Sequence, residues 1–367
     1  MFWRASLWRG NERIGVSVSS YLRNTWYVAA WNDHVEPGKL LARVILEEPI
    51  VFFRDESGIV KAIADRCPHR FAPLSQGKWD RGIIQCAYHG LRFDGFGRCV
   101  HNPHGEGKIP AAATLKSYPV TERHGAVWIW MGDASSADAA LIPDYSFLES
   151  TVATARFRGY LPTNANYQLI ADNIMDLSHV DYLHAGTLGG GAISRTKIDV
   201  TELNDGRLHV KWISPNEVPP PVFGAHLPDP KANADVWTEV IWTAPGNMML
   251  HTGASPVGRP MEEGVDTHNV HLMTPRDETY THYFYAGTRS FNVMDAGFNA
   301  FTAGFIEKIF VTEDKWMLEA QQKCMGTADL LSLKPVLLQG DAGAMRARRM
   351  LQQKMRAEQM ALTSPTS

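Results

Sequence analysis

Short apolar runs separated by turn-forming residues dominate the first third of the chain. Runs rich in β-branched and aromatic residues are typical of β-strands, and glycine and polar clusters between them are typical of turns. The runs lie at residues 25–30, 41–46, 50–53, 59–64 and 127–132, with a hairpin turn at residues 55–58. This pattern predicts a small all-β domain.

A small and polar segment at residues 133–140 follows the last predicted strand and is typical of a linker. We therefore expect an N-terminal extension at residues 1–20, the all-β domain at 21–140, a larger second domain at 141–345, and a C-terminal helix and tail at 346–367. Basic residues on that last helix predict a solvated face, with a docking surface for an acidic partner as the alternative. They are Arg346, Arg348, Arg349, Lys354 and Arg356.

The second domain contains a segment with apolar residues at positions 170, 174, 177 and 180, which is the spacing of an α-helix. His179 and His184 in this segment are five residues apart, about 140° around a straight helix. Both can reach one ion only if the helix ends or bulges between them, and π-bulges often occur at functional sites. Asp176, three residues before His179, is predicted to share its face. A purely structural role for these polar residues is the alternative.

A later segment, residues 305–322, also has helical spacing. Asp314 lies four residues after Phe310 and four residues before Leu318, so it falls on the apolar stripe of this predicted helix. A carboxylate on an apolar stripe is costly unless it is paired or binds a metal ion. Asp314 is therefore a candidate ligand, and Glu313 beside it is the competing carboxylate.

The composition narrows the class of protein. A chain of 367 residues is expected to form about two domains. The net charge of −3 argues against nucleic-acid binding, and no apolar run approaches the roughly 18 residues of a membrane span. The N-terminus lacks the apolar core and cleavage site of a secretory signal, so a cytoplasmic protein is expected. Four cysteines are too few for a disulfide framework at this length.

Two of the four cysteines are coupled to histidines. Cys67 lies two residues before His69, and Cys86 lies three residues before His89. Thiolates and imidazoles at such spacings are metal ligands. A structural zinc site is the alternative, but zinc fingers usually pair cysteine with cysteine and histidine with histidine. The mixed pairs favour a two-iron cluster in which both cysteines bind one iron ion and both histidines bind the other.

These pairs, with Arg70 and Gly90 after the two histidines, resemble the motif of the Rieske [2Fe–2S] proteins. The chain from about residue 24 to residue 322 resembles the oxygenase component of Rieske non-haem iron oxygenases, in particular the vanillate and dicamba O-demethylase branch. The matching residues in the second domain are Asp172, Asn173, Asp176, His179 and His184, followed by Glu313-Asp314-Lys315 and Glu319-Ala320. The resemblance implies an α+β fold, with an N-terminal all-β Rieske domain and a C-terminal catalytic domain built on a helix-flanked antiparallel β-sheet.

The resemblance also implies two metal centres and O2 as a co-substrate. One centre is a Rieske [2Fe–2S] cluster, and its expected ligands are Cys67, His69, Cys86 and His89. The other is a mononuclear non-haem Fe(II), and its expected ligands are His179, His184 and Asp314. Two histidines and one carboxylate leave positions open on the iron for O2 and substrate.

Oxygenases of this family are typically homotrimers arranged head to tail. This implies that Asp176 bridges to the Rieske histidine of a neighbouring subunit, which is His89 in this sequence. A separate reductase with flavin and iron–sulfur groups is expected to supply electrons from NAD(P)H.

The expected reaction is O-demethylation of a methoxylated aromatic acid similar to vanillate, which releases a phenol and formaldehyde. One alternative is a related oxygenase that hydroxylates an aryl methyl group or dioxygenates an aromatic ring. The other is an electron-transfer Rieske protein without oxygenase activity.

The sequence indicates the substrate contacts less specifically than the metal ligands. His251, His271 and His282 lie on predicted strands of the second domain, Phe305 precedes Asp314 by nine residues, and Asn173 belongs to the matched pattern. We take all five as candidates. For each of the three histidines a structural role in the sheet is the alternative, and Phe305 is equally consistent with an ordinary core residue.

Overall fold

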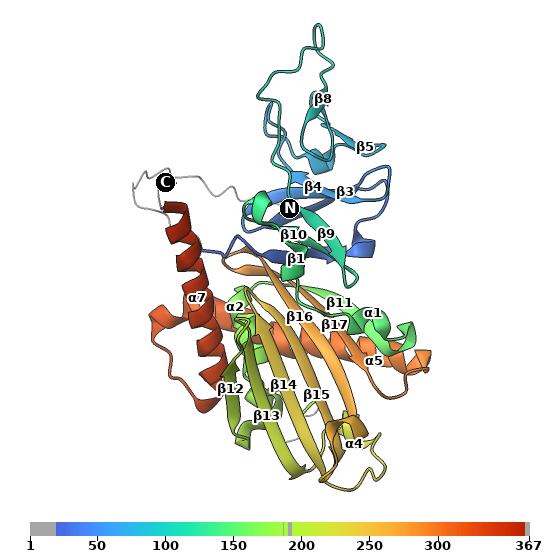
Figure 1. Ribbon diagram of the computed structural model, residues 1–367, viewed down its shortest axis with the longest axis vertical. Helices are drawn as coiled ribbons and strands as arrows, with labels where there is room; N and C mark the ends of the chain where they lie inside the picture. The colour runs from blue at the N-terminus through green and yellow to red at the C-terminus, as the bar shows by residue number, and fades with distance from the viewer. Residues whose placement is uncertain (1–19, 186, 190–192, 364–367) are drawn as a thin grey trace.

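Three small antiparallel sheets form the first part of the chain, drawn in blue and green in Figure 1. The computed structural model describes residues 20–185, 187–189 and 193–363, so the predicted extension at residues 1–20 lies, except for Ser20, outside the described residues. The sheets have the strand orders β1-β10-β9, β2-β3-β4 and β5-β6-β7-β8. Their strands are β1 (Trp26–Trp31), β2 (Leu41–Ile45), β3 (Glu48–Arg54), β4 (Val60–Ala64), β5 (Lys78–Asp80), β6 (Ile83–Gln85), β7 (Arg92–Phe93), β8 (Cys99–His101), β9 (Val120–Arg123) and β10 (Ala126–Trp130).

Strands β1 and β10 are apolar along their whole length because both of their faces are covered. Every residue of the two strands is buried. One face packs within the first domain, and the other packs against Val270, Leu272 and Phe284 of the second domain. The hydroxyl of Thr274 also donates to the carbonyl oxygen of Val28 at 2.7 Å. The two domains therefore share a core.

The sheet β5-β6-β7-β8 shares a small core with strands β3 and β4 and lies at the end of the molecule away from the second domain (Figure 1). Its buried residues include Cys67, Leu74, Ile84 and Cys86. The predicted cluster ligands therefore lie near one end of the molecule.

A single antiparallel sheet of seven strands forms the second domain, with the order β11-β17-β16-β15-β14-β13-β12. Burial alternates along β13, where Leu208, Val210 and Trp212 are buried and Lys211 is not. Such alternation is typical of a sheet with one packed face. The strands are β11 (Arg156–Thr163), β12 (Ile198–Glu202), β13 (Leu208–Glu217), β14 (Ala234–Thr243), β15 (Asn247–Pro256), β16 (Val265–Asp277) and β17 (Tyr280–Arg289).

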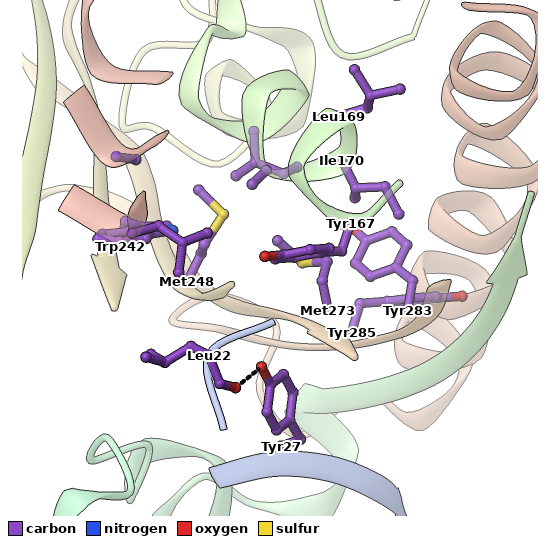
Figure 2. Packing of buried hydrophobic residues seen from close by; sticks show 14 of the residues in the cluster. Leu22, Tyr27, Tyr167, Leu169, Ile170, Trp242, Met248, Met273, Tyr283 and Tyr285 are labelled. Atoms are coloured by element: carbon purple, nitrogen blue, oxygen red, sulfur yellow. Dashed lines mark hydrogen bonds between the residues drawn. The ribbon is translucent and has the colours of Figure 1, made fainter. Parts of the chain in front are cut away.

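Helices flank this sheet, and Figure 2 shows the core beneath α2. Tyr167 and Ile170 of α2 pack with Met273, Tyr283 and Tyr285 of the sheet. The helices are α1 (Phe147–Ser150), α2 (Tyr167–Met175), α3 (Val180–Leu183), α4 (Pro221–Gly224), α5 (Ala296–Ile309), α6 (Lys315–Met325) and α7 (Ala342–Thr363). The predicted α+β class, with an all-β domain followed by a helix-flanked antiparallel sheet, is confirmed. The predicted boundary near residue 140 falls between β10 and β11.

The C-terminal helix α7 begins at Ala342 and not at residue 346. Arg348 was predicted on its solvated face, and this was wrong. Its Nε and Nη2 donate to the carboxylate of Asp172 at 3.0 and 2.6 Å, which ties α7 to α2. Arg349 is exposed. Among the described residues, none of the helices has the length and apolar character needed to span a membrane.

Candidate metal centre and substrate cavity

The segment with the two candidate histidines is not one continuous helix. Helix α2 ends at Met175, a 3₁₀ turn follows at Leu177–His179, and α3 ends at Leu183. The expectation that a helix must end or bulge for both side chains to reach one ion is met in this way. The imidazole rings of His179 and His184 lie 5.2 Å apart, centre to centre.

The predicted helix at residues 305–322 is interrupted as well. A π-helical turn at Phe310–Asp314 separates α5 from α6. The wider turn changes the direction of the side chains, and Asp314 at its end is buried. π-Turns of this kind are frequent at functional sites. Between the two histidines the helix ends, at Leu183, which is one of the two expected possibilities, and the π-turn lies at the aspartate instead.

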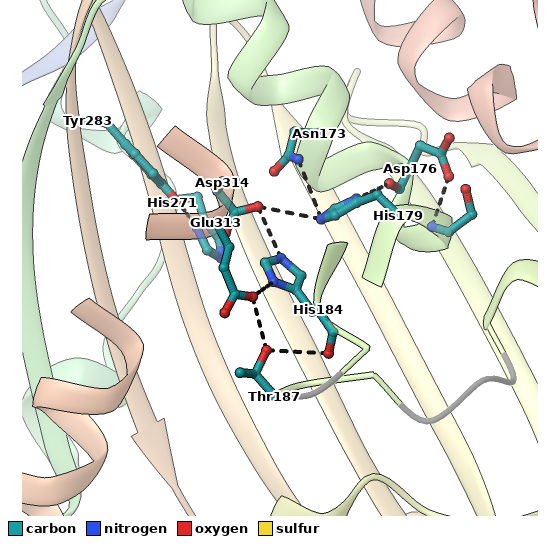
Figure 3. A network of polar contacts seen from close by, with 10 residues as sticks. Asn173, Asp176, His179, His184, Thr187, His271, Tyr283, Glu313 and Asp314 are labelled. Carbon is teal, nitrogen blue, oxygen red and sulfur yellow. Dashed lines mark hydrogen bonds and ion pairs between the residues drawn. The ribbon is translucent and has the colours of Figure 1, made fainter. Parts of the chain in front are cut away.

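His179, His184 and Asp314 meet at one point. Their ligand atoms all lie within 4.8 Å of one another. Asp314 Oδ1 is 3.1 Å from Nε2 of His184 and 3.6 Å from Nε2 of His179 (Figure 3). This is the donor set of a metal centre with two imidazoles and one carboxylate, in which three ligands leave further positions open.

Both histidines are held by their second ring nitrogen. Nδ1 of His179 donates to the carbonyl oxygen of Asp176 at 2.7 Å, and Nδ1 of His184 donates to Glu313 at 2.6 Å. Thr187 also donates to Glu313, at 3.0 Å. Each Nδ1–H is used in this way, so a neutral ring carries its lone pair on Nε2, which faces Asp314 (Figure 3). Glu313, which the sequence offers as a competitor of Asp314 for the metal, instead orients His184.

Electrostatics keep the carboxylate of Asp314 ionised. Burial alone would raise its pKa, but hydrogen bonds from His179 and His184 lower it to about 2. Burial alone would lower the pKa of His184, but Asp314 and then Glu313 raise it overall. An anionic oxygen and two imidazole nitrogens therefore face one another, which suits a divalent cation.

The carboxylate of Asp176 does not contact His179, so the prediction that the two side chains share one helix face was wrong. Its Oδ1 accepts from the backbone N–H of Ser178 at 3.0 Å. The reason is that Asp176 caps the end of α2, so its carbonyl oxygen and not its side chain reaches the imidazole. Among the described residues, Oδ2 has no hydrogen-bond partner.

A mainly apolar cavity with a volume of about 190 Å³ opens beside the three candidate ligands. A cavity of about 150 Å³ is large enough to hold benzene, so this one fits a single substituted ring. Two of the substrate candidates line it, namely Asn173 and His271. The amide Nδ2 of Asn173 is 3.4 Å from Nε2 of His179.

Three other candidates do not line the cavity. His251 lies between Leu250 and Thr252, which do line it, so strand alternation places His251 on the opposite face of β15. There it bonds Asp266 at 3.0 Å. His282 joins the two domains through the carbonyl oxygen of Val44, at 3.0 Å.

Phe305 is the third of these candidates. Its ring stacks on the exposed Phe301, at 5.8 Å between ring centres. The cavity is reached instead by Thr302, Ile306 and Phe310 of the same helical stretch. Phe305 therefore lies on a face of the helix that does not line the cavity, and its prediction as a substrate contact was wrong.

The cysteine and histidine pairs form a second group, remote from the first (Figure 1). The side chains of Cys67 and Cys86 are buried, and this burial, followed by the neighbouring Cys86 thiol, raises the pKa of Cys67. The rings of His69 and His89 lie 4.4 Å apart, centre to centre, and are nearer the surface. Gly90 has φ +76°, which completes the turn after the second histidine.

The sequence and structure were compared with known proteins. Residues 25–119 match the model of the Rieske [2Fe–2S] domain, and residues 163–357 match that of the vanillate O-demethylase oxygenase C-terminal domain. The chain belongs to the Rieske oxygenases of the O-demethylase type. The recognition made from the cysteine–histidine pairs and the histidine–aspartate pattern is confirmed.

Relatives of known activity cover nearly the whole chain of this Rieske oxygenase. The oxygenase component of chloroacetanilide N-alkylformylase from Rhizorhabdus wittichii is 39% identical, over 92% of this chain and 97% of the relative. The oxygenase component of dicamba O-demethylase from Stenotrophomonas maltophilia is 35% identical, over 90% and 96%. A crystal structure of dicamba monooxygenase bound to 3,6-dichlorosalicylic acid has a TM-score of 0.85 at 34% identity, and covers 92% of this chain and 98% of its own.

Another dicamba monooxygenase structure contains non-haem iron and dicamba, with a TM-score of 0.80 at 33% identity and 93% and 99% coverage. Together with the Rieske domain, this relative supports a [2Fe–2S] cluster and a non-haem iron as the cofactors of the family.

Proposed function

We propose that this Rieske oxygenase holds a mononuclear iron through His179, His184 and Asp314, and removes the methyl group of a methoxylated aromatic compound. The observation that carries the proposal is the convergence of two imidazoles and one ionised carboxylate beside an apolar cavity of the size of one ring. The Nε2 lone pairs and the anionic oxygen fit a divalent iron, and the orienting contacts of both rings are those of metal-binding histidines.

The [2Fe–2S] cluster would be held by Cys67, Cys86, His69 and His89. Only two sets of three metal-binding groups lie within 4.8 Å of one another among the described residues, and neither includes these four. Their wider spacing suits two iron ions and not one zinc ion. Buried thiols and more exposed imidazoles also leave the histidine side of the cluster facing outward.

When bound, the cluster supplies single electrons and the mononuclear iron activates O2. The residues of the chain do the rest. The apolar lining excludes water and holds the ring with its methoxy group toward the triad, and His271 offers a hydrogen bond from the sheet. One oxygen atom inserted into the methyl C–H bond gives a hemiacetal, which collapses to a phenol and formaldehyde. The other oxygen atom leaves as water, using two electrons and two protons.

The two metal-binding groups lie far apart in one chain (Figure 1), which supports the head-to-tail homotrimer implied by the resemblance. Large apolar side chains are exposed beside each group. Phe71 and Tyr88 flank the Rieske ligands with 62% and 66% of their surface exposed. Val336 and Leu338, which precede α7 near Asp176, are 88% and 71% exposed. Different apolar patches on one chain suit a heterologous contact that closes into a ring.

In that trimer, the free Oδ2 of Asp176 would accept a hydrogen bond from the partner subunit's His89. Asp176 would then connect the Rieske domain of one subunit to the iron site of the next. We further propose that a separate reductase with flavin and iron–sulfur groups delivers the electrons from NAD(P)H, because the described part of this chain offers no dinucleotide-binding unit of its own.

The proposal is tested by reconstituting the purified protein with a surrogate reductase, NADH and a panel of methoxyarenes. Formaldehyde and the matching phenol should appear together, and the protein should contain about three iron atoms per chain, two in the cluster and one in the triad. Ring or methyl hydroxylation without formaldehyde would favour the related oxygenases. About two iron atoms per chain and no O2 consumption would favour an electron carrier.

A further inference from the structure

The polar groups that line the cavity are almost all used within the protein. Thr238 and Thr252 bond each other at 3.0 Å, and Thr252 donates to the carbonyl oxygen of Trp237. Asn269 donates to Thr267 at 3.1 Å. These groups are therefore already satisfied before a substrate enters.

His271 is different. Its side chain is buried and lines the cavity, and its Nδ1 is 2.6 Å from the hydroxyl of Tyr283 (Figure 3). Its Nε2 is buried and has no hydrogen-bond partner. Burial lowers the pKa of His271 to about 4, so the ring is neutral near pH 7. A buried polar atom without a partner costs free energy, which a substrate atom can recover.

The tautomer of His271 follows from its neighbour. Burial holds the pKa of Tyr283 well above its usual range, so the phenol keeps its proton. This hydroxyl is the hydrogen-bond partner of Nδ1 among the described residues, so the O–H donates to Nδ1. Nε2 then carries the hydrogen atom, and it donates to an acceptor on the substrate.

The described residues offer no free cation near His271. Among the described residues, Arg289 is the only arginine or lysine in the lining; its Nη1 and Nη2 are hydrogen-bonded, whereas its buried Nε has no hydrogen-bond partner. It donates to Asn299 at 2.6 Å and to the carbonyl oxygens of Thr154 and Asn292. The cross-strand partner of His271 is four residues from Arg289 on β17, which is about 13 Å along a strand.

The acidic groups of the metal centre lie at the same cavity. Asp314 lines it and Glu313 stands behind His184. An anion placed against His271 would lose its hydration without gaining a cation.

Building on the proposed function, we propose that the cavity selects a neutral methoxyarene with a hydrogen-bond acceptor, such as an amide or ester carbonyl, held by Nε2 of His271, and rejects the corresponding carboxylate. This narrows the substrate class and departs from the aromatic acid that the resemblance to vanillate demethylases implies. The selecting features are the unpartnered Nε2 of His271 and the apolar wall that includes Leu250.

The test compares each of the 2-, 3- and 4-methoxybenzamides with the methoxybenzoate of the same substitution, because the two differ little in shape. Binding to the iron-loaded holoenzyme is measured at pH 7 by calorimetry, and turnover by formaldehyde release with a surrogate reductase. For the best-bound isomer, we expect the amide to bind at least 30-fold more tightly than the carboxylate. Equal or tighter binding of the carboxylate overturns the proposal.

Binding tests the proposed substrate preference, and turnover tests the proposed reaction. If the amide binds preferentially but yields no formaldehyde, the substrate preference stands and the proposed reaction fails. His271→Phe should remove most of the amide's advantage, while His268→Phe should retain it, because His268 lies on the same strand with its side chain outside the cavity. Equal loss in both variants, or no loss in His271→Phe, contradicts the role of Nε2.

Discussion

Replacing Glu313 by glutamine tests whether this carboxylate prepares His184 for metal binding. The glutamate accepts from Nδ1 of His184 at 2.6 Å and from Thr187 at 3.0 Å, with His184 only 3% exposed. Glutamine keeps the length and an acceptor oxygen but removes the charge. A hydrogen bond to a charged group contributes about 1.5–3 kcal/mol, against about 0.5–1.5 kcal/mol for a neutral pair.

The difference of about 1–1.5 kcal/mol corresponds to roughly a 5- to 12-fold weaker affinity for iron. This lies at the lower edge of the 10- to 100-fold losses found when metal-orienting partners are removed. The assay is titration of the iron-depleted triad with Fe(II) under anaerobic conditions, followed by recovery of O2 consumption. The cluster's visible absorption should stay unchanged, because Glu313 is remote from it.

Glu307→Gln is the matched control, since Glu307 is exposed on α5 and makes the same change of charge. Its iron affinity should equal that of the wild type. Unchanged affinity in Glu313→Gln, or an equal loss in both variants, would refute the reasoning.

Three further predictions concern stability, pH and turnover. Arg348→Leu should lower the free energy of unfolding by about 3 kcal/mol in urea titrations, because it leaves Asp172 without its partner, and Arg349→Leu should change it little. Burial lowers the pKa of His282 to about 4, which is below its pKa in the unfolded chain. As the pH falls, the unfolded state therefore binds a proton before the folded state does. The free energy of unfolding should then decrease between about pH 6.5 and pH 4. His282→Gln should make the free energy of unfolding depend less on pH in this window, where His282 contributes at most about 3 kcal/mol. An unchanged pH dependence would contradict the role of His282. Asp176→Asn should keep both metal centres filled and slow turnover severely, and full activity would exclude the bridging role.

The Rieske half of the site could be predicted because its ligands are close in sequence. Cys67 and His69 lie on one loop, and Cys86 and His89 lie on another. Each pair can therefore be recognised from a short stretch of sequence, without information on how distant segments pack together. The strands around them were also predictable, because short apolar runs and turns are local features.

The iron half depends on departures from regular helices. His179 and His184 converge because α2 ends early, and Asp314 turns inward because of a π-turn. The sequence indicated that some break was needed, but helical spacing alone does not locate it. The contact between Glu313 and His184 joins residues 129 positions apart, so no local pattern could show it.

The substrate candidates show how a shift of one residue changes the outcome. Leu250 faces the cavity and His251 faces away from it, because side chains alternate along a strand. Ile306 lines the cavity and Phe305 does not. Choosing residues by their chemistry favoured the histidine and the phenylalanine, whereas the register of the strand and the helix decided which side chains reach the cavity.

The central claim is that the triad and the cavity carry out O-demethylation. Its most direct test is the ratio of formaldehyde released to O2 consumed, measured with the best neutral methoxyarene, the wild-type protein and a surrogate reductase. The account predicts equal amounts of the two at saturating substrate, and loss of both in His184→Ala with the cluster retained. O2 consumption without formaldehyde from any methoxyarene, or formaldehyde that persists in His184→Ala, would contradict it.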